Sequence, residues 1–170
     1  GKMKSREGTV VDADDLMEEV VNAATVMTQE RGQIAELSET ERSVLFESIG
    51  MGGLKYYLLK VDPKKRMLFN PEESIDLTGN TGPFIQYTHA RINSLLRKAG
   101  LIQIDESTLV IESGEIELIK LLDAFPQTIA EAADNYSPAV LANYLYELTK
   151  AYNSFYQQSP ILTETNEGLR

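Results

Sequence analysis

The stretch GNTGPFIQYTHARINSLLRKAG, residues 79–100, contains the clearest helix signal in the sequence. Its opening glycines predict a tight turn, Thr81 is suited to cap a helix, and Pro83 is suited to the first helical turn. Lys98 lies where a basic residue favours the end of a helix, and Gly100 follows it. The pattern therefore predicts a helix that runs to Lys98.

The same predicted helix alternates aromatic rings with basic side chains. These residues are Phe84, Tyr87, His89, Arg91, Arg97 and Lys98. Tyr87 and Arg91 are four residues apart and therefore share one helix face. A ring that stacks on an unstacked base, beside a guanidinium that binds a phosphate or a base edge, can hold single-stranded RNA. The alternative interpretation is an ordinary surface pair on a helix whose apolar residues form the core.

The N-terminal half predicts two further helices and two short strands. A helix is expected over residues 13–31, and a second one begins at Ser38, whose spacing to Glu41 is that of a capping box. The GMGG at residues 50–53 is expected to interrupt or kink this second helix and to let two helices approach closely. Apolar runs at 9–11 and 67–69 predict short strands.

The C-terminal half continues the helical pattern. Residues 101–114 are predicted to form a linker, followed by a helix over 115–134 with a kink at Pro126. Ser137 is expected to cap the next helix, which carries an apolar stripe with several tyrosines. The predicted fold class is all-α. It consists of a helical bundle with an N-terminal loop and helix, residues 1–31, as an appendage.

Composition limits the function classes. The net charge is −10, which argues against binding to DNA or RNA through bulk charge, although residues 49–100 hold eight cations and four anions. There are no cysteines and no apolar run long enough to span a membrane, so we expect a cytoplasmic protein without membrane partners. With one histidine and no thiol, the sequence predicts no metal site.

The opening loop, GKMKSREG, is the other unusual stretch. Lys2, Lys4 and Arg6 alternate with Met3 and Ser5 between two glycines. Cations on a short loop are suited to neutralise the charge that develops on a pyrophosphate leaving group. The alternative interpretation is a solvated basic N-terminus. No nucleophile elbow, Walker loop or dinucleotide motif accompanies it.

Three stretches together resemble the arginyl-tRNA synthetases, a family of class I aminoacyl-tRNA synthetases. They are GKMKSREGTVVDADDLMEEV, LFNPEESIDLTGNTGPFIQYTHARINSLLRKA and LANYLYELTKAYNSFYQQSPIL. The first resembles the class I signature loop, usually Lys-Met-Ser-Lys-Ser, and the other two resemble helices of the anticodon-binding domain. The resemblance implies that residues 1–31 belong to a catalytic domain and that residues 32–170 are the anticodon-binding bundle, without its last helix.

The resemblance also implies site residues for ATP-dependent joining of arginine to its tRNA. Lys2, Lys4, Ser5 and Arg6 would form the catalytic loop that contacts ATP, with Mg²⁺, in the parent enzyme. Lys4 and Ser5 stand where the usual pattern has serine and then lysine, so either Lys4 or Arg6 could contact the phosphates. The chain alone is expected to be inactive and to hold no ATP, because the catalytic domain in cis would lie before Gly1.

The implied nucleic-acid partner is the anticodon loop of arginine tRNA, bound by Phe84, Tyr87 and Arg91. His89 is expected to be a hydrogen-bonded, partly buried residue rather than a catalyst. Two alternatives stay open: a non-enzymatic helical domain that binds another protein, and a different class I synthetase.

Overall fold

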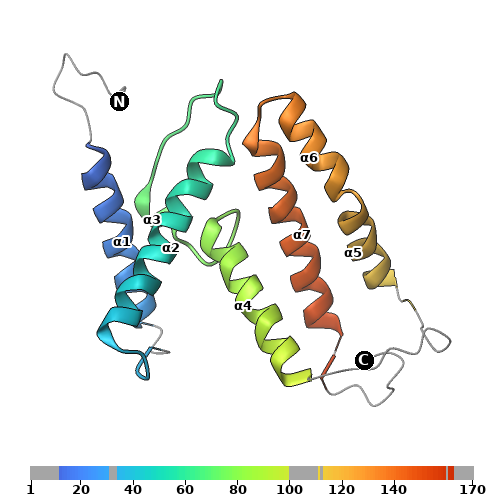
Figure 1. The fold of residues 1–170 in the computed structure, drawn as a ribbon, viewed down its shortest axis with the longest axis horizontal. Helices are drawn as coiled ribbons and strands as arrows, with labels where there is room; N and C mark the ends of the chain where they lie inside the picture. The colour runs from blue at the N-terminus through green and yellow to red at the C-terminus, as the bar shows by residue number, and fades with distance from the viewer. Residues whose placement is uncertain (1–11, 31–33, 100–110, 112, 160, 163–170) are drawn as a thin grey trace. The chain divides into compact units, whose positions relative to one another are not determined.

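The computed structural model describes residues 12–30, 34–99, 111, 113–159 and 161–162. These residues form helices and loops and no strand, which confirms the predicted all-α class (Figure 1). Contacts group the chain into two compact units, Gly1–Phe84 and Ile85–Arg170. The boundary expected between residues 31 and 32 stays a prediction, because both residues lie outside the described part.

The first unit contains α1 (Ala13–Glu30), α2 (Glu39–Leu59) and the short α3 (Pro71–Ser74). The predicted capping box begins α2: the Glu41 amide donates to Ser38 Oγ at 3.3 Å, and the Ser38 amide donates to Glu41 Oε2 at 2.9 Å. The bonds from the Ser38 side chain and backbone hold the pKa of Glu41 below its usual value. Local chemistry therefore fixes where this helix starts.

The GMGG segment lies inside α2, which runs through it without interruption, so the predicted break is wrong. The predicted close approach is confirmed. A Cβ on Gly50 would lie 2.8 Å from the Cα of Val21 in α1, and a Cβ on Gly53 would lie 2.8 Å from the carbonyl oxygen of Ser74 in α3. The close packing requires glycine at both positions, because the Cβ of any other residue would clash with backbone atoms.

The strand predicted at 67–69 is also wrong. Leu68 is 81% exposed, and no described strand is available to pair with this segment. Backbone groups in a strand need a partner ladder, which an isolated apolar run cannot supply. Phe69 instead packs edge-on against Tyr57 of α2, with ring centroids 5.3 Å apart. The strand predicted at 9–11 lies outside the described residues.

The turn before α4 (Gly82–Ala99) is fastened to α2. Asn80 accepts two hydrogen bonds: its side-chain Oδ1 from the Tyr56 hydroxyl at 2.5 Å, and its carbonyl from Lys60 Nζ at 2.7 Å. The predicted cap is present, since Thr81 Oγ1 accepts from the Phe84 amide at 3.3 Å. The start of α4 is thereby fixed by side chains as well as by its glycines.

The second unit contains the rest of α4 with α5 (Ser113–Asp123), α6 (Phe125–Asp134) and α7 (Pro138–Gln158). The kink expected at Pro126 is present as a break between α5 and α6. Both helices pack along α7 (Figure 1), where the Tyr144 hydroxyl donates to the Leu121 carbonyl at 2.8 Å. Ser137 occupies the predicted cap position, although its hydroxyl makes no capping bond.

We expect Gly50→Ala to lower the free energy of unfolding. The new methyl group would meet backbone atoms of Val20 and Val21, and overpacking of this kind costs about 1–3 kcal/mol. Alanine gains helix propensity over glycine, but only by about 1 kcal/mol. Glu47→Ala, an exposed change on the same helix, is the matched control and should shift stability by less than about 0.5 kcal/mol. Denaturant unfolding that shows Gly50→Ala as stable as the parent chain would contradict the close contact.

Candidate nucleic-acid interface

Arg91 of the predicted pair Tyr87 and Arg91 also contacts the ring of Tyr156 from α7. The Arg91 guanidinium carbon lies 4.9 Å from the ring centroid of Tyr87 on its own helix and 5.1 Å from that of Tyr156. Tyr87 is 49% exposed, whereas Arg91 and Tyr156 are half-buried. Guanidinium groups are attracted to the faces of aromatic rings at these distances. Arg91 is therefore held between rings beside an accessible tyrosine.

A hydrogen-bond network fixes the same arginine from α7. Arg91 donates to the side-chain oxygen of Asn153. The Asn153 amide nitrogen donates to Thr88 Oγ1 at 2.7 Å and to the Thr149 carbonyl at 3.0 Å. Thr88 and Thr149 are buried, so these bonds are shielded from water. The network joins α4 to α7 and sets the orientation of Arg91.

The arginine keeps unused binding capacity. Among the described residues, no carboxylate pairs with Arg91, and the one side-chain hydrogen bond that it donates goes to Asn153. A guanidinium carries five N–H donors in a planar fork, so several stay available to an incoming acceptor. The site thus combines a positive charge, free donors and an accessible ring.

A second tyrosine of α7, Tyr152, stacks on Tyr156. The rings of Tyr152 and Tyr156 stack with centroids 6.1 Å apart and planes at 28°. Burial is the main reason that the pKa of Tyr152 is raised, with Tyr156 adding to the rise and Arg91 opposing it. Tyr152 therefore stays neutral at physiological pH, and its ring packs against that of Tyr156.

The other residues predicted on α4 fall into two groups. Phe84 is half-buried in the first turn, and its spacing to Tyr87 and Arg91 places all three along one helix face. His89 is exposed, so its expected partial burial is wrong; its hydrogen bonding is confirmed, since His89 Nε2 lies 3.0 Å from Asn93 Nδ2. The histidine lies on a part of the helix that faces solvent.

The predicted catalytic residues Lys2, Lys4, Ser5 and Arg6 lie outside the described residues. Sequence reasoning missed Asn153 and Tyr156, which complete the interface from α7. The available signal was the spacing of the tyrosines in YELTKAYNSFYQQ, which were expected to belong to the apolar stripe of that helix. Within the described ranges no cluster of three or more acidic, histidine or cysteine side chains could hold a metal. None of the described helices is long and apolar enough to cross a membrane.

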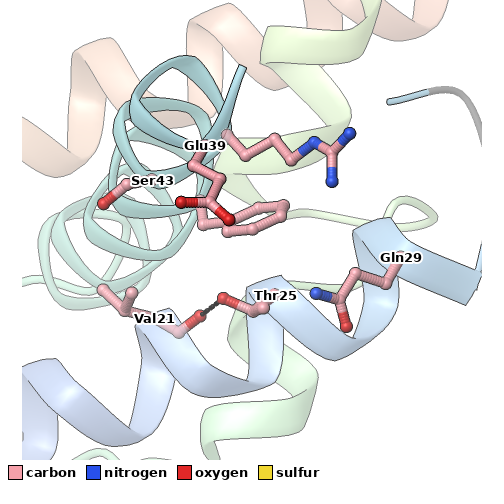
Figure 2. Close-up of a pocket in the computed structure, with 7 residues that line it drawn as sticks. Val21, Thr25, Gln29, Glu39 and Ser43 are labelled. Carbon is pink, nitrogen blue, oxygen red and sulfur yellow. Dashed lines mark hydrogen bonds between the residues drawn. The ribbon is translucent and has the colours of Figure 1, made fainter. Parts of the chain in front are cut away.

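A separate pocket of about 310 Å³ lies in the first unit between α1 and α2. Figure 2 shows Glu39 and Ser43 of α2 facing Val21, Thr25 and Gln29 of α1. The Thr25 hydroxyl donates to the Val21 carbonyl at 2.8 Å (Figure 2). Arg42, which also lines the pocket, donates to the carbonyls of Ile34 and Ala35. The side chains of Thr25 and Arg42 thus stabilise the backbone around the pocket. None of the predicted site residues lines the pocket.

The described residues form a helical module in which an aromatic and cationic surface joins α4 to α7, and comparison with known proteins gives the family. Residues 85–170 match the family described as DALR anticodon binding domain. The chain belongs to this family, whose matched range is the second unit and contains Tyr87, Arg91, Asn153 and Tyr156.

Two curated relatives cover the whole chain. Arginine–tRNA ligase of Flavobacterium psychrophilum is 58% identical over 171 residues, and that of Bacteroides thetaiotaomicron is 51% identical over 175 residues. The chain spans 28% and 29% of the lengths of these two relatives. The resemblance to arginyl-tRNA synthetases predicted from the sequence is confirmed.

Solved structures show the same fold. The arginyl-tRNA synthetase of Thermus thermophilus aligns with 96% of the chain at a TM-score of 0.85 and 29% identity. That of Plasmodium falciparum aligns with 94% at a TM-score of 0.78 and 25% identity. In each case the match covers 28% of the other chain.

Asn153→Ala should destabilise the second unit. The substitution removes the hydrogen-bond acceptor of Arg91 and the amide that donates to the buried Thr88 hydroxyl, and the loss of such buried bonds costs about 1–3 kcal/mol. Gln157→Ala, at an exposed position on the same helix, is the control and should have little effect. Thermal unfolding followed by circular dichroism measures both variants. Equal melting temperatures for the two would show that the network does not hold α4 to α7.

Proposed function

We propose that this chain is the anticodon-binding part of an arginine–tRNA ligase and that its second unit grips the anticodon loop of arginine tRNA. The observation that carries the proposal is the Arg91 guanidinium, held between two tyrosine rings beside the exposed Tyr87. The names of the matched family and of the curated relatives support the choice of RNA and of amino acid.

The geometry suggests a division of roles. The accessible ring of Tyr87 offers a face on which a splayed-out base can stack, and such stacking is worth about 1–3 kcal/mol per base. The free donors of Arg91 bind a base edge or a phosphate oxygen next to that base. Asn153 and Tyr156 keep the guanidinium in place, and Phe84 extends the same face by one turn. Few side-chain conformations of the chain then have to be fixed when RNA binds.

In the parent enzyme, we propose, arginine is activated with ATP and joined to tRNA in the cytoplasm. Lys2, Lys4, Ser5 and Arg6 would bind the ATP phosphates, accompanied by Mg²⁺, opposite a catalytic domain in cis. Positioning of the substrates supplies a large part of the rate in such reactions. The 170-residue chain alone is therefore expected to be catalytically incompetent.

A protein-binding role is the second candidate, because α5 and α6 expose a stripe of apolar side chains. Its members are Ile116, Ile119, Leu122, Phe125 and Ile129, each between 41% and 58% exposed. Exposed apolar stripes often mark contact surfaces. We rank this role second, because Arg91 retains unused donors beside the accessible ring of Tyr87.

Tyr87→Ala and Arg91→Ala should each weaken binding of arginine tRNA by about 1–3 kcal/mol, the scale of one stacked base. Filter binding at fixed salt, against arginine tRNA and a non-cognate tRNA, measures the effect. Tyr136→Ala is the matched control, because it removes a tyrosine that is 89% exposed and lies outside the site. Arg91→Lys keeps the charge but loses the planar fork, so we expect it to lose preference for the cognate tRNA.

Equal affinity of the parent chain for both tRNAs, unchanged in Tyr87→Ala and Arg91→Ala, would remove anticodon recognition from this helix. Binding that falls equally in Tyr136→Ala would show that the loss is not specific to the site.

A further inference from the structure

Three consecutive cations lie on the turn that follows α2 in the first unit. Lys64, Lys65 and Arg66 are all exposed, and none of their side chains bonds to a described residue. The chain as a whole carries a net charge of −10, so this turn is a local reversal of its charge. Three adjacent cations without internal partners lower their mutual repulsion by binding anions.

The turn is fixed at its entry by Asp62. The Asp62 carboxylate accepts a hydrogen bond from the Lys64 amide at 2.8 Å, and its carbonyl accepts from the Lys65 amide at 2.8 Å. The Asp62 carboxylate is therefore bonded to the backbone of the turn, and it pairs with none of the three cationic side chains.

The turn is also fixed at its exit by Tyr57 of α2. The Tyr57 hydroxyl donates to the Leu68 carbonyl at 3.0 Å, and its ring contacts Phe69. Burial, and then the nearby Glu73 carboxylate, raises the pKa of Tyr57, so the hydroxyl keeps its proton at physiological pH. Lys60 Nζ lies 4.3 Å from the centre of the same ring. With both ends held, the three cations are presented on a preorganised turn, and little chain entropy is lost when an anion binds.

We propose that Lys64, Lys65 and Arg66 form a second RNA contact, which binds phosphate oxygens of the tRNA backbone without reading its sequence. This inference rests on the proposed function, which makes tRNA the polyanion that this chain meets. The turn offers two ammonium groups and one guanidinium but no free aromatic face, since Phe69 is engaged by Tyr57. Charge without a stacking surface favours phosphates over bases.

The test is the salt dependence of tRNA binding by the full chain and by the triple variant Lys64→Ala/Lys65→Ala/Arg66→Ala. Loss of three phosphate contacts should reduce the slope of log affinity against log salt by about 2–3 and weaken binding about 10-fold or more at 0.1 M salt. The loss should be the same for arginine tRNA and for a non-cognate tRNA. Tyr87→Ala is expected to act differently, by reducing the preference for arginine tRNA.

Controls separate charge at this turn from charge in general. Lys65→Ala should lower the slope by about one, whereas Lys120→Ala, an exposed lysine on α5, should leave it unchanged. The charge-keeping variant Lys64→Arg/Lys65→Arg/Arg66→Lys should bind like the parent chain. Circular dichroism confirms that each variant is folded, and the single Lys65→Ala serves if the triple variant is not.

Each outcome decides between the two proposals. Unchanged affinity and slope in the triple variant overturn the second contact and favour another partner, such as a protein, for the turn; the anticodon site stands if Tyr87→Ala still weakens binding. A loss confined to the turn variants supports the second contact and rejects the anticodon site. A parent chain that binds neither RNA rejects both.

Discussion

The contact of Arg91 with α7 determines how the second unit presents its aromatic and cationic surface. Arg91 reaches from α4 to Asn153 and lies between the rings of Tyr87 and Tyr156, while Asn153 also holds the buried Thr88. One polar link thus joins two helices and presents a cation with free donors. Polar networks of this kind specify a single arrangement because leaving any buried member unpaired is costly. The same hydrogen bonds therefore join α4 to α7 and orient the Arg91 guanidinium.

The first unit positions the beginning of α4 by a different means. Gly50 and Gly53 let α1 and α3 lie against the backbone of α2, and Asn80 ties the following turn to two side chains of α2. The contacts at the two glycines are steric, and they leave no room for an added methyl group. Close backbone packing and hydrogen-bonded turns give the helix carrying Tyr87 a defined start.

The sequence predicted helices well because their ends carry local signals. The capping box at Ser38, the cap at Thr81 and the break at Pro126 are all present. The predictions were wrong at residues 50–53 and 67–69, where tertiary contacts determine the structure. The glycines at 50–53 pack against neighbouring elements inside an unbroken α2. The apolar run at 67–69 has no described partner strand and is irregular. Tyr87 and Arg91 could be chosen from spacing on one helix. Asn153 and Tyr156 could not be identified from the sequence, because they meet α4 only in the folded chain. Tyrosines at helical spacing are, moreover, ordinarily core residues.

The proposed contact of Tyr87 and Arg91 with the anticodon loop can be observed directly in solution. A nuclear magnetic resonance titration of the chain, with tyrosine and arginine side chains isotopically labelled, against an RNA hairpin carrying an arginine anticodon tests it most directly. We expect the ring signals of Tyr87 and the guanidinium signals of Arg91 to shift together and to saturate at one hairpin per chain. Saturable binding that leaves both sets of signals unmoved would contradict the account.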